Sequence, residues 1–168
     1  MNKINLMLHA HQPYVRHLEY EKFLEEDWLY EALNESYIPL LRMLKKLDEN
    51  GIKTAVLSNK PDEFVGKILK KVYPDHTFAE AWGKKPEYKI KPDGEALLAI
   101  LEKQGVSKEE CIYIGDSDVD VYTAQNAGVK MAGVEWGFRG REELISTGAP
   151  FVAATAEELF DYITGCNE

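Results

Sequence analysis

Three aspartates stand within five positions of the sequence, directly after a short apolar run. The stretch YIGDSDVDVYTAQNAGV at 113–129 predicts a strand that ends at Gly115, with Asp116, Asp118 and Asp120 leading into a helix. Carboxylates at the carboxyl end of a strand suit a hard cation such as Mg²⁺, which takes one or two carboxylates and keeps water and phosphate oxygens as its other ligands. The alternative is an acidic turn that complements the helix dipole. Asp116 and Asp120 are therefore the candidate metal ligands.

Two further stretches carry groups that could hold a phosphate. AVLSNK at 55–60 ends a strand with the hydroxyl of Ser58, and the backbone N–H of Asn59 could help that hydroxyl hold a phosphate oxygen. YKIKPDGEALL places Lys91 before a new helix, where its ammonium could neutralise a phosphoryl group. Taken alone, the first is a common strand-end turn and the second a solvated lysine. Together they predict a binding site for phosphate or sulfate.

The apolar run INLML near the N-terminus ends in two histidines, His9 and His11. Imidazole is about neutral at pH 7 and is a poor ligand for Mg²⁺, although zinc, nickel and copper accept it. A transition-metal site formed by His9, His11 and Asp116 is therefore one hypothesis. Surface or packing positions are the alternative for the two histidines.

The overall composition excludes several classes of protein. A chain of 168 residues with 45% hydrophobic and 29% charged residues is typical of one globular domain, here 1–168. The net charge of −9 disfavours nucleic acid and anionic membranes as partners. The two cysteines give little support for a disulfide framework, and no apolar stretch is long enough to span a bilayer, so we expect a cytoplasmic protein.

The elements that must position the candidate site can be predicted from short apolar runs. These predict strands near 4–8, 54–58, 77–82, 111–115, 131–136 and 151–154. Helical patterns lie between them at 62–72, 93–104 and 118–127. Strands that alternate with helices predict an α/β fold with a doubly wound parallel sheet of five or six strands. Ligands should then bind at the carboxyl ends of the strands.

Two predicted helices have an apolar face that should pack on the sheet. The helix at 62–72 has the stripe Phe64, Val65, Ile68, Leu69 and Val72. The helix at 37–49, closed by Gly51, has the face Leu40, Leu41, Leu44 and Leu47.

The segment before that second helix is rich in aromatic and acidic residues, and a further helix is expected at 28–35. Residues 14–38 could cover a sheet edge or form a homodimer contact. Local packing over the mouth of the site is the alternative.

The order Ser58, Lys91, Asp116, Asp120 on successive strand ends resembles haloacid-dehalogenase-like (HAD) phosphatases, most closely the phosphoglycolate phosphatase branch. The resemblance covers residues 48–165. It implies a Rossmann-like sheet whose first strand lies centrally, beside the strands that bear Ser58 and Asp116. It also implies Mg²⁺ bridging the phosphate and an aspartate nucleophile after the first strand, with a second aspartate two residues later as general acid. No segment resembles the family's separate cap domain.

The sequence after the first predicted strand departs from that family pattern, because His9 and His11 stand where the two aspartates are expected. Residues 1–45 instead resemble the start of glycoside hydrolases of family fifty-seven, whose fold is a distorted (β/α) barrel. No carboxylate pair for glycoside hydrolysis follows. We therefore interpret residues 1–47 as a barrel fragment grafted onto a HAD core at 48–168.

Three hypotheses about function follow from this interpretation. The first is an engineered chimera with no intact active site and no required cofactor, which binds phosphate weakly. The second is a HAD-type Mg²⁺-dependent phosphohydrolase in which other groups replace the missing aspartates. The third is a protein that binds a transition metal through His9 and His11. Whether the chain is an enzyme depends on which of the three holds.

Overall fold

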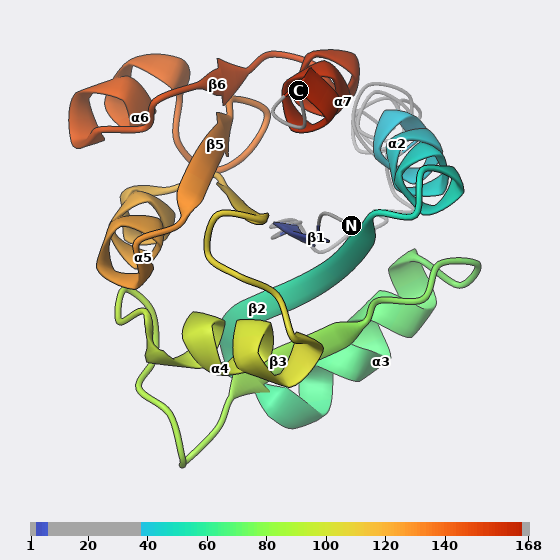
Figure 1. Ribbon diagram of the computed structural model, residues 1–168, viewed down its shortest axis with the longest axis vertical. Helices are drawn as coiled ribbons and strands as arrows, with labels where there is room; N and C mark the ends of the chain where they lie inside the picture. The colour runs from blue at the N-terminus through green and yellow to red at the C-terminus, as the bar shows by residue number, and fades with distance from the viewer. Residues whose placement is uncertain (1–2, 7–37, 166–168) are drawn as a thin grey trace, which may run out of the picture.

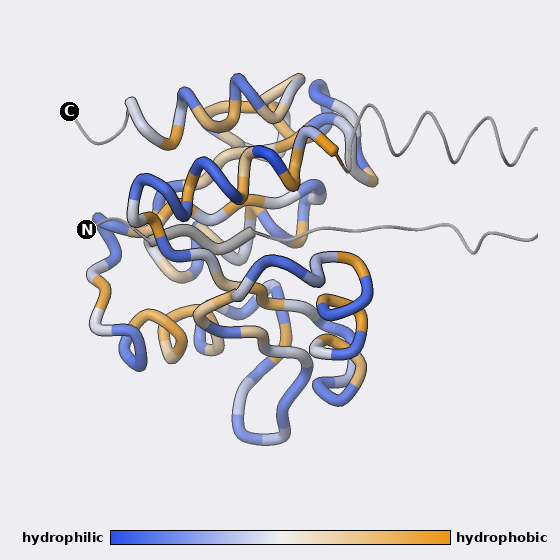
Figure 2. Tube along the Cα trace, turned by 90° about the vertical axis from the view of Figure 1, so that its right-hand side faces the viewer, coloured by the Kyte–Doolittle hydropathy of each residue, from blue (hydrophilic) through white to orange (hydrophobic). Residues whose placement is uncertain are grey.

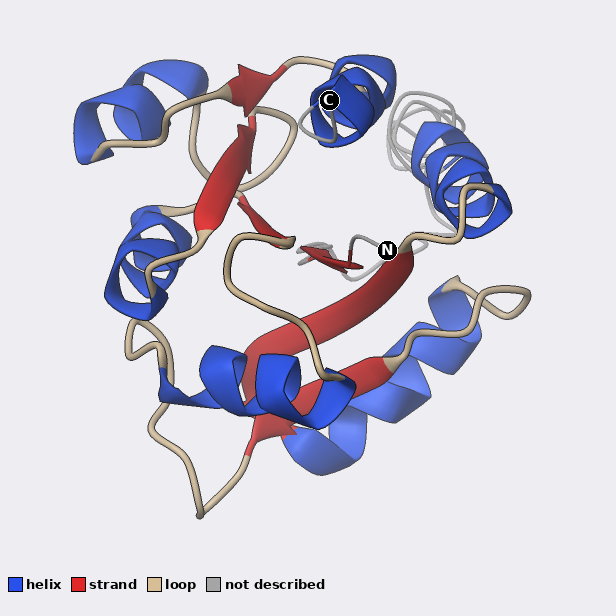
Figure 3. Ribbon diagram, viewed as in Figure 1, coloured by secondary structure: helices blue, strands red, loops and turns tan. Residues whose placement is uncertain are grey.

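The chain forms a six-stranded parallel sheet with helices on both faces (Figure 1, Figure 3). The computed structural model describes residues 3–6 and 38–165. The strands are β1 (Lys3–Leu6), β2 (Lys53–Pro61), β3 (Glu80–Lys84), β4 (Cys111–Gly115), β5 (Lys130–Val134) and β6 (Val152–Ala153). Their spatial order is β3-β2-β1-β4-β5-β6. The predicted α/β fold with a doubly wound parallel sheet is confirmed.

The first strand lies in the middle of this sheet and pairs in parallel with both neighbours. Lys3 is in register with Lys53 of β2 on one side and with Cys111 of β4 on the other. This confirms the predicted central position, next to the strands that carry Ser58 and lead to Asp116. The carboxyl ends of β1, β2 and β4 therefore meet at one edge, where a parallel sheet places its ligands.

Helices are divided between the two faces of the sheet. The helices are α2 (Ile38–Glu49), α3 (Asp62–Val72), α4 (Glu95–Gln104), α5 (Asp118–Ala127), α6 (Arg141–Thr147) and α7 (Ala156–Gly165). In Figure 1, α2, α3 and α7 lie on one side of the sheet and α4, α5 and α6 on the other. Hydrophobic and hydrophilic residues alternate along the helical turns that Figure 2 shows. Each helix can therefore bury one stripe against the sheet while its other side faces water.

The core consists of one large apolar cluster on each face. On the α2 and α7 side, Leu44, Leu47 and Leu159 are fully buried against strand residues such as Ile114. On the opposite side the strands pack on α4, α5 and α6 through Leu97, Val121, Leu144 and their neighbours. Both faces of the central strands are thus covered, which explains why their sequences are continuous apolar runs rather than alternating ones.

Glycine ends two of the helices that lie under the candidate site. Gly105 follows α4 with φ 60° and Gly128 follows α5 with φ 70°. This left-handed conformation lets the glycine N–H bond the last carbonyls of the helix, and a side chain would make it strained. Both helices therefore end at a glycine.

The predicted packing faces of α2 and α3 are only partly correct. Phe64 and Ile68 of α3 are 46% and 41% exposed, and Leu41 of α2 is 37% exposed. In α3 only Val65 is fully buried. The reason is that α3 covers β2 and the edge strand β3, so the sheet ends beneath the helix and leaves its outer side in water. In α2, Met43 is buried where we expected Leu41.

Within the described residues, no helix has the length and hydrophobicity needed to cross a membrane. The helix expected at 28–35 and the aromatic segment 14–38 lie outside the described residues, except for Ile38 at the start of α2.

Candidate active site

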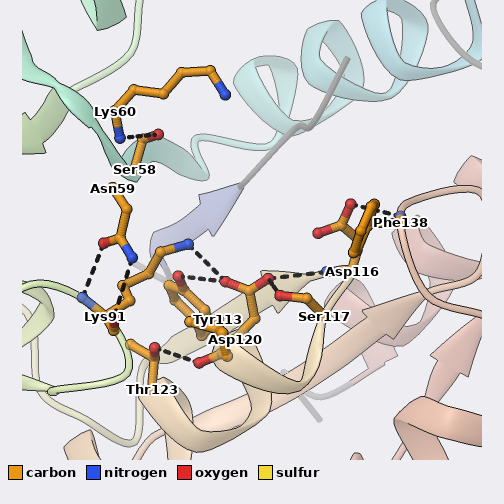
Figure 4. Close-up of polar contacts among 11 residues, drawn as sticks. Ser58, Asn59, Lys60, Lys91, Tyr113, Asp116, Ser117, Asp120, Thr123 and Phe138 are labelled. Atoms are coloured by element: carbon orange, nitrogen blue, oxygen red, sulfur yellow. Dashed lines mark hydrogen bonds and ion pairs between the residues drawn. The ribbon is translucent and has the colours of Figure 1, made fainter. Parts of the chain in front are cut away.

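The predicted site residues converge at the carboxyl edge of the sheet (Figure 4). Ser58 and Asn59 belong to the end of β2, and Lys91 lies in the connection between β3 and α4. Asp116 follows β4 directly, and Asp120 lies in the first turn of α5. The parallel topology therefore brings residues separated by more than sixty positions to one edge of the sheet.

A buried ion pair forms the centre of this network. The Lys91 Nζ atom lies 2.8 Å from Asp120 Oδ1, and the two side chains are 2% and 0% exposed. Burial lowers the pKa of Lys91, and the attraction of Asp120 offsets this only in part. A buried charge of this kind needs its partner, because either group alone would carry the full cost of desolvation.

Asp120 accepts four hydrogen bonds, two on each carboxylate oxygen. Oδ1 accepts from Lys91 and, at 3.2 Å, from the Tyr113 hydroxyl. Oδ2 accepts from the Ser117 hydroxyl at 2.7 Å and from the Asp116 backbone N–H at 3.3 Å. Burial by itself would raise the pKa of Asp120, but Lys91 and the two hydroxyl donors outweigh it and hold that pKa below its ordinary value.

Two members of this network were not predicted from the sequence. The Tyr113 hydroxyl lies inside the core, where burial and then the Asp120 charge raise its pKa well above the ordinary value, so it remains a donor. Ser117 precedes α5 as its N-cap but makes no side-chain bond to the helix backbone. The Ser-x-x-Asp spacing of Ser117 and Asp120 is close to the capping-box pattern and was the available signal.

The Asn59 side chain fixes the main chain at Lys91. Its amide nitrogen donates to the Lys91 carbonyl at 3.0 Å, and its Oδ1 accepts from the Lys91 backbone N–H at 2.9 Å. A carboxamide satisfies both backbone groups of one residue in this way. We had expected the backbone N–H of Asn59 to contribute, whereas the structure gives its side chain a positioning role.

Ser58 lies half-buried beside Asn59 and Lys60. Its hydroxyl oxygen accepts from the Lys60 backbone N–H at 3.2 Å. That contact orients the hydroxyl near the carboxyl end of β2. Ser58 therefore lies on the same sheet edge as Lys91, as the sequence predicted.

Asp116 and Asp118 have different surroundings. Asp116 is 2% exposed, and its Oδ2 accepts from the Phe138 backbone N–H at 2.9 Å. The side chain of Asp118 is 41% exposed and lies 4.0 Å from the Arg139 guanidinium. Asp118 therefore points toward the surface, and Asp116 toward the site.

These surroundings favour Asp116 over Asp120 as a ligand for Mg²⁺. Within the described residues no group of three or more histidine, cysteine, aspartate or glutamate side chains is arranged to hold a metal. Mg²⁺ does not need such a group, because one or two carboxylates with water and phosphate oxygens suffice. Asp116 at the strand end fits that requirement, whereas each oxygen of Asp120 already accepts two hydrogen bonds.

His9 and His11 lie outside the described residues, and so does the transition-metal site predicted from them together with Asp116.

Comparison with known proteins identifies the family. A family model described as "Haloacid dehalogenase-like hydrolase" matches residues 7–134. A curated relative, phosphoglycolate phosphatase 1 of Pseudomonas aeruginosa, is 35% identical over 107 residues, which cover 64% of this chain and 39% of the relative. Phosphoglycolate phosphatase of Vibrio parahaemolyticus is 30% identical over 131 residues, with coverage of 78% and 58%. The chain thus spans less than two-thirds of the length of each of these two relatives.

Solved structures agree with this assignment. A Lactobacillus delbrueckii protein provisionally named as a phosphoglycolate phosphatase matches with a TM-score of 0.71 and 36% identity, over 74% of this chain and 52% of that one. A predicted phosphatase from Clostridium acetobutylicum matches with a TM-score of 0.70 over 84% of this chain and 68% of that one. At 23% identity, the second match supports the fold alone.

The interpretation as an engineered chimera without an intact active site is wrong. The family match begins at residue 7, inside the segment that we had compared with glycoside hydrolases. A provisionally named pyrophosphatase of Caldanaerobacter subterraneus aligns over 90% of this chain, which is more than residues 48–168 could supply. The resemblance of the N-terminal segment to a glycoside hydrolase barrel has no support from these comparisons. The chain belongs to the haloacid dehalogenase-like hydrolase family.

Proposed function

We propose that this protein is a Mg²⁺-dependent phosphohydrolase that acts on phosphate monoesters. The observation that carries the proposal is the Lys91 ammonium, held by Asp120 at the sheet edge that Ser58 and Asp116 share. Two curated relatives are named phosphoglycolate phosphatases, which supports the substrate class. The cytoplasmic location expected from the composition belongs to the same proposal.

Each described residue has a distinct role in this proposal. The Ser58 hydroxyl and the Lys91 ammonium bind the phosphoryl oxygens, because a hydroxyl donor and a cation stabilise the charge that grows there during transfer. Asp120 keeps Lys91 charged and fixes the position of its ammonium. Asn59 sets the main-chain position from which the Lys91 side chain extends. Asp116 would hold Mg²⁺, which supplies positive charge to the phosphoryl oxygens when bound.

The attacking group is proposed from the sequence that follows β1. His9 and His11 stand there in place of the family's aspartates, and neutral imidazole is a competent nucleophile toward phosphorus. A histidine nitrogen would form a bond to phosphorus as the P–O ester bond breaks, and the alcohol would leave with a proton taken from water. A second water molecule would then cleave the P–N bond, releasing inorganic phosphate and the free histidine. Replacing His9 and His11 with alanine, singly and together, tests this part of the proposal.

The activity is tested with p-nitrophenyl phosphate and a panel of small phosphate monoesters, with and without Mg²⁺. We expect turnover that depends on Mg²⁺ and on both Lys91 and Asp116. Loss of a charged group that stabilises the transition state typically lowers kcat by about 100-fold or more. Lys91→Met and Asp116→Asn should each show a loss of about that size.

Lys89→Met is the matched control for Lys91→Met. Lys89 lies two residues away with a side chain that is 74% exposed, so its replacement should leave turnover unchanged. Circular dichroism of each variant checks that the fold is kept. Absence of turnover above the buffer rate for every ester would overturn the proposal, and so would equal effects of the two lysine substitutions.

A further inference from the structure

The connection between β5 and α6 passes directly over the Asp116 carboxylate. We propose that this connection, residues 135–140, is a positioning element that sets the orientation of the Asp116 carboxylate for metal binding. The Phe138 amide bonds the carboxylate, and Gly137 allows the main chain to approach it closely. We call these residues the Asp116 loop. The inference rests on the proposed function, because it assigns Asp116 to Mg²⁺.

Two backbone amides of the Asp116 loop bond Asp116. The Phe138 N–H donates to Asp116 Oδ2 at 2.9 Å, and the Arg139 N–H donates to the Asp116 main-chain carbonyl at 3.0 Å. One bond therefore fixes the side chain and the other the backbone of the same residue. A donor on one carboxylate oxygen fixes the plane of the carboxylate, and partners of this kind commonly change metal affinity by 10- to 100-fold.

Glycine is required at position 137 because there is no room for a side chain, not because of its backbone conformation. A Cβ atom at this position would lie 2.1 Å from Asp116 Cβ and 2.5 Å from Asp116 Oδ2, far inside contact distance. The φ angle of Gly137 is not in the left-handed region. Any side chain here must therefore displace either the loop or the carboxylate that the loop holds.

Ion pairs brace the loop from its two ends. The Arg141 Nε atom lies 2.7 Å from Glu135 Oε2, which joins the residues on either side of the turn. The Arg139 Nε atom lies 3.2 Å from Glu143 in α6, and its guanidinium lies over the Phe138 ring. The Phe138 ring itself is 62% exposed. The loop is thus shaped by its charged side chains, and Phe138 contributes to Asp116 through its amide rather than its ring.

The test compares Gly137→Ala with Gly140→Ala. Both substitutions add one methyl group to the same loop, but a Cβ at Gly140 would meet nothing within 4 Å. We expect titration calorimetry with MgCl₂ alone to show a Kd raised by about 10- to 100-fold for Gly137→Ala. Gly140→Ala should bind Mg²⁺ like the wild type.

Phe138→Pro and Phe138→Ala provide a second comparison that does not depend on Gly137→Ala folding. Proline removes the N–H that Asp116 accepts, whereas alanine removes only the ring. We expect the proline variant to lose Mg²⁺ affinity by about tenfold and the alanine variant to keep it. Affinity for inorganic phosphate without metal should be equal in both, because Lys91 is held by Asp120 and the Ser58 hydroxyl by the Lys60 amide, both of which lie outside the loop.

The outcomes separate this inference from the proposed function. If the wild type binds Mg²⁺ and hydrolyses phosphate esters while Gly137→Ala and Phe138→Pro keep wild-type Mg²⁺ affinity, the loop proposal is overturned and the proposed function stands. If the wild type neither binds Mg²⁺ nor turns over any ester, the proposed function fails and the inference fails with it. A selective loss of Mg²⁺ affinity in the two variants, with phosphate affinity kept, supports the inference.

Discussion

The Lys91 ammonium and the Asp120 carboxylate lie 2.8 Å apart with almost no exposure to solvent. The two residues come from different connections of the sheet, and the pair ties the start of α5 to the connection before α4. Its energetic value depends on both partners being present, since each is costly to bury alone. This pair is therefore the part of the site in which stability and the proposed chemistry depend most strongly on each other.

Asp120→Asn should destabilise the fold strongly, because it leaves the Lys91 ammonium buried without a counter-charge. We expect a loss of about 3 kcal/mol or more in the free energy of unfolding, measured by urea denaturation. The double variant Lys91→Met/Asp120→Leu should lose less than the sum of the single changes.

The exposed pair of Lys89 and Asp93 is the control for that measurement. Its atoms lie 3.4 Å apart with side chains 74% and 37% exposed. Asp93→Asn should destabilise the fold much less than Asp120→Asn, because solvent screens an exposed ion pair. If Asp120→Asn were as stable as Asp93→Asn, the buried pair of Lys91 and Asp120 would contribute no more to stability than the exposed pair.

Asn59→Ala should weaken the site by releasing the main chain at Lys91. Two hydrogen bonds are lost, and each is typically worth about 1 kcal/mol. We expect calorimetry with inorganic phosphate to show a weaker affinity for this variant than for the wild type.

Asn126→Ala serves as the comparison for Asn59→Ala, since the Asn126 side chain makes one bond, at 2.8 Å, to the adjacent Pro92 carbonyl. It should affect phosphate affinity less than Asn59→Ala does. A wild-type affinity in Asn59→Ala would contradict the positioning role of Asn59.

The ionised Glu80 carboxylate should stabilise the folded protein, and this stabilisation should be lost in acid. Its carboxylate accepts from the Trp82 indole at 2.7 Å, from Lys103 at 3.0 Å and from Gln104 at 2.9 Å. Burial by itself would raise the pKa of Glu80, but Lys103, Trp82 and Gln104 together hold the pKa below its ordinary value of 4.5. Because the folded pKa is the lower one, the stabilisation is present above pH 4.5 and is lost as the pH falls through the folded pKa.

The Glu80→Gln variant tests this dependence. Urea denaturation at two pH values measures how much less stable this variant is than the wild type. The difference in the free energy of unfolding should be larger at pH 6 than at about pH 3. Glu102→Gln, at an exposed position in α4, is the control and should show no such change. A deficit for Glu80→Gln that is the same at both pH values would rule out the ionic contribution.

Two glycine-to-alanine substitutions should change the free energy of unfolding in opposite directions. At Gly94, a Cβ would lie 2.6 Å from the Ala127 backbone nitrogen, so alanine forces α4 and α5 apart. We expect a loss of about 1–3 kcal/mol, as for other overpacked sites. At Gly66, inside α3, a Cβ meets nothing within 4 Å, and alanine should add up to about 1 kcal/mol through its helix propensity. Thermal unfolding of the two variants measures both effects. If both variants were more stable than the wild type, or both less stable, the close packing at Gly94 would be contradicted.

The sequence was sufficient for those features that depend on local pattern. The strand at 111–115 and the helices at 62–72 and 118–127 have the predicted bounds, because apolar runs and helical periodicity report burial directly. Lys91, Asp116 and Asp120 could be selected as site residues because each stands at the carboxyl end of a predicted strand or just before a helix. In a parallel sheet, that position alone brings side chains together.

Long-range contacts could not be predicted in the same way. The Asn59 carboxamide bonds a main chain 32 residues away, and nothing in a strand-end asparagine reveals that partner. The amide of Phe138 acts on Asp116 across 22 residues through backbone atoms that every residue possesses. Exposure of Phe64 and Ile68 depends on where the sheet ends, which helical periodicity does not report.

The pairing of β1 with β4 can form only after β4 has been synthesised. Lys3 is synthesised 108 residues before Cys111, its partner in β4. The edge of β1 that faces β4 stays open until residue 115 has emerged, and open strand edges favour association between chains. We therefore expect nascent chains to be most prone to association before β4 has been made, and strong overexpression to direct part of the product into inclusion bodies.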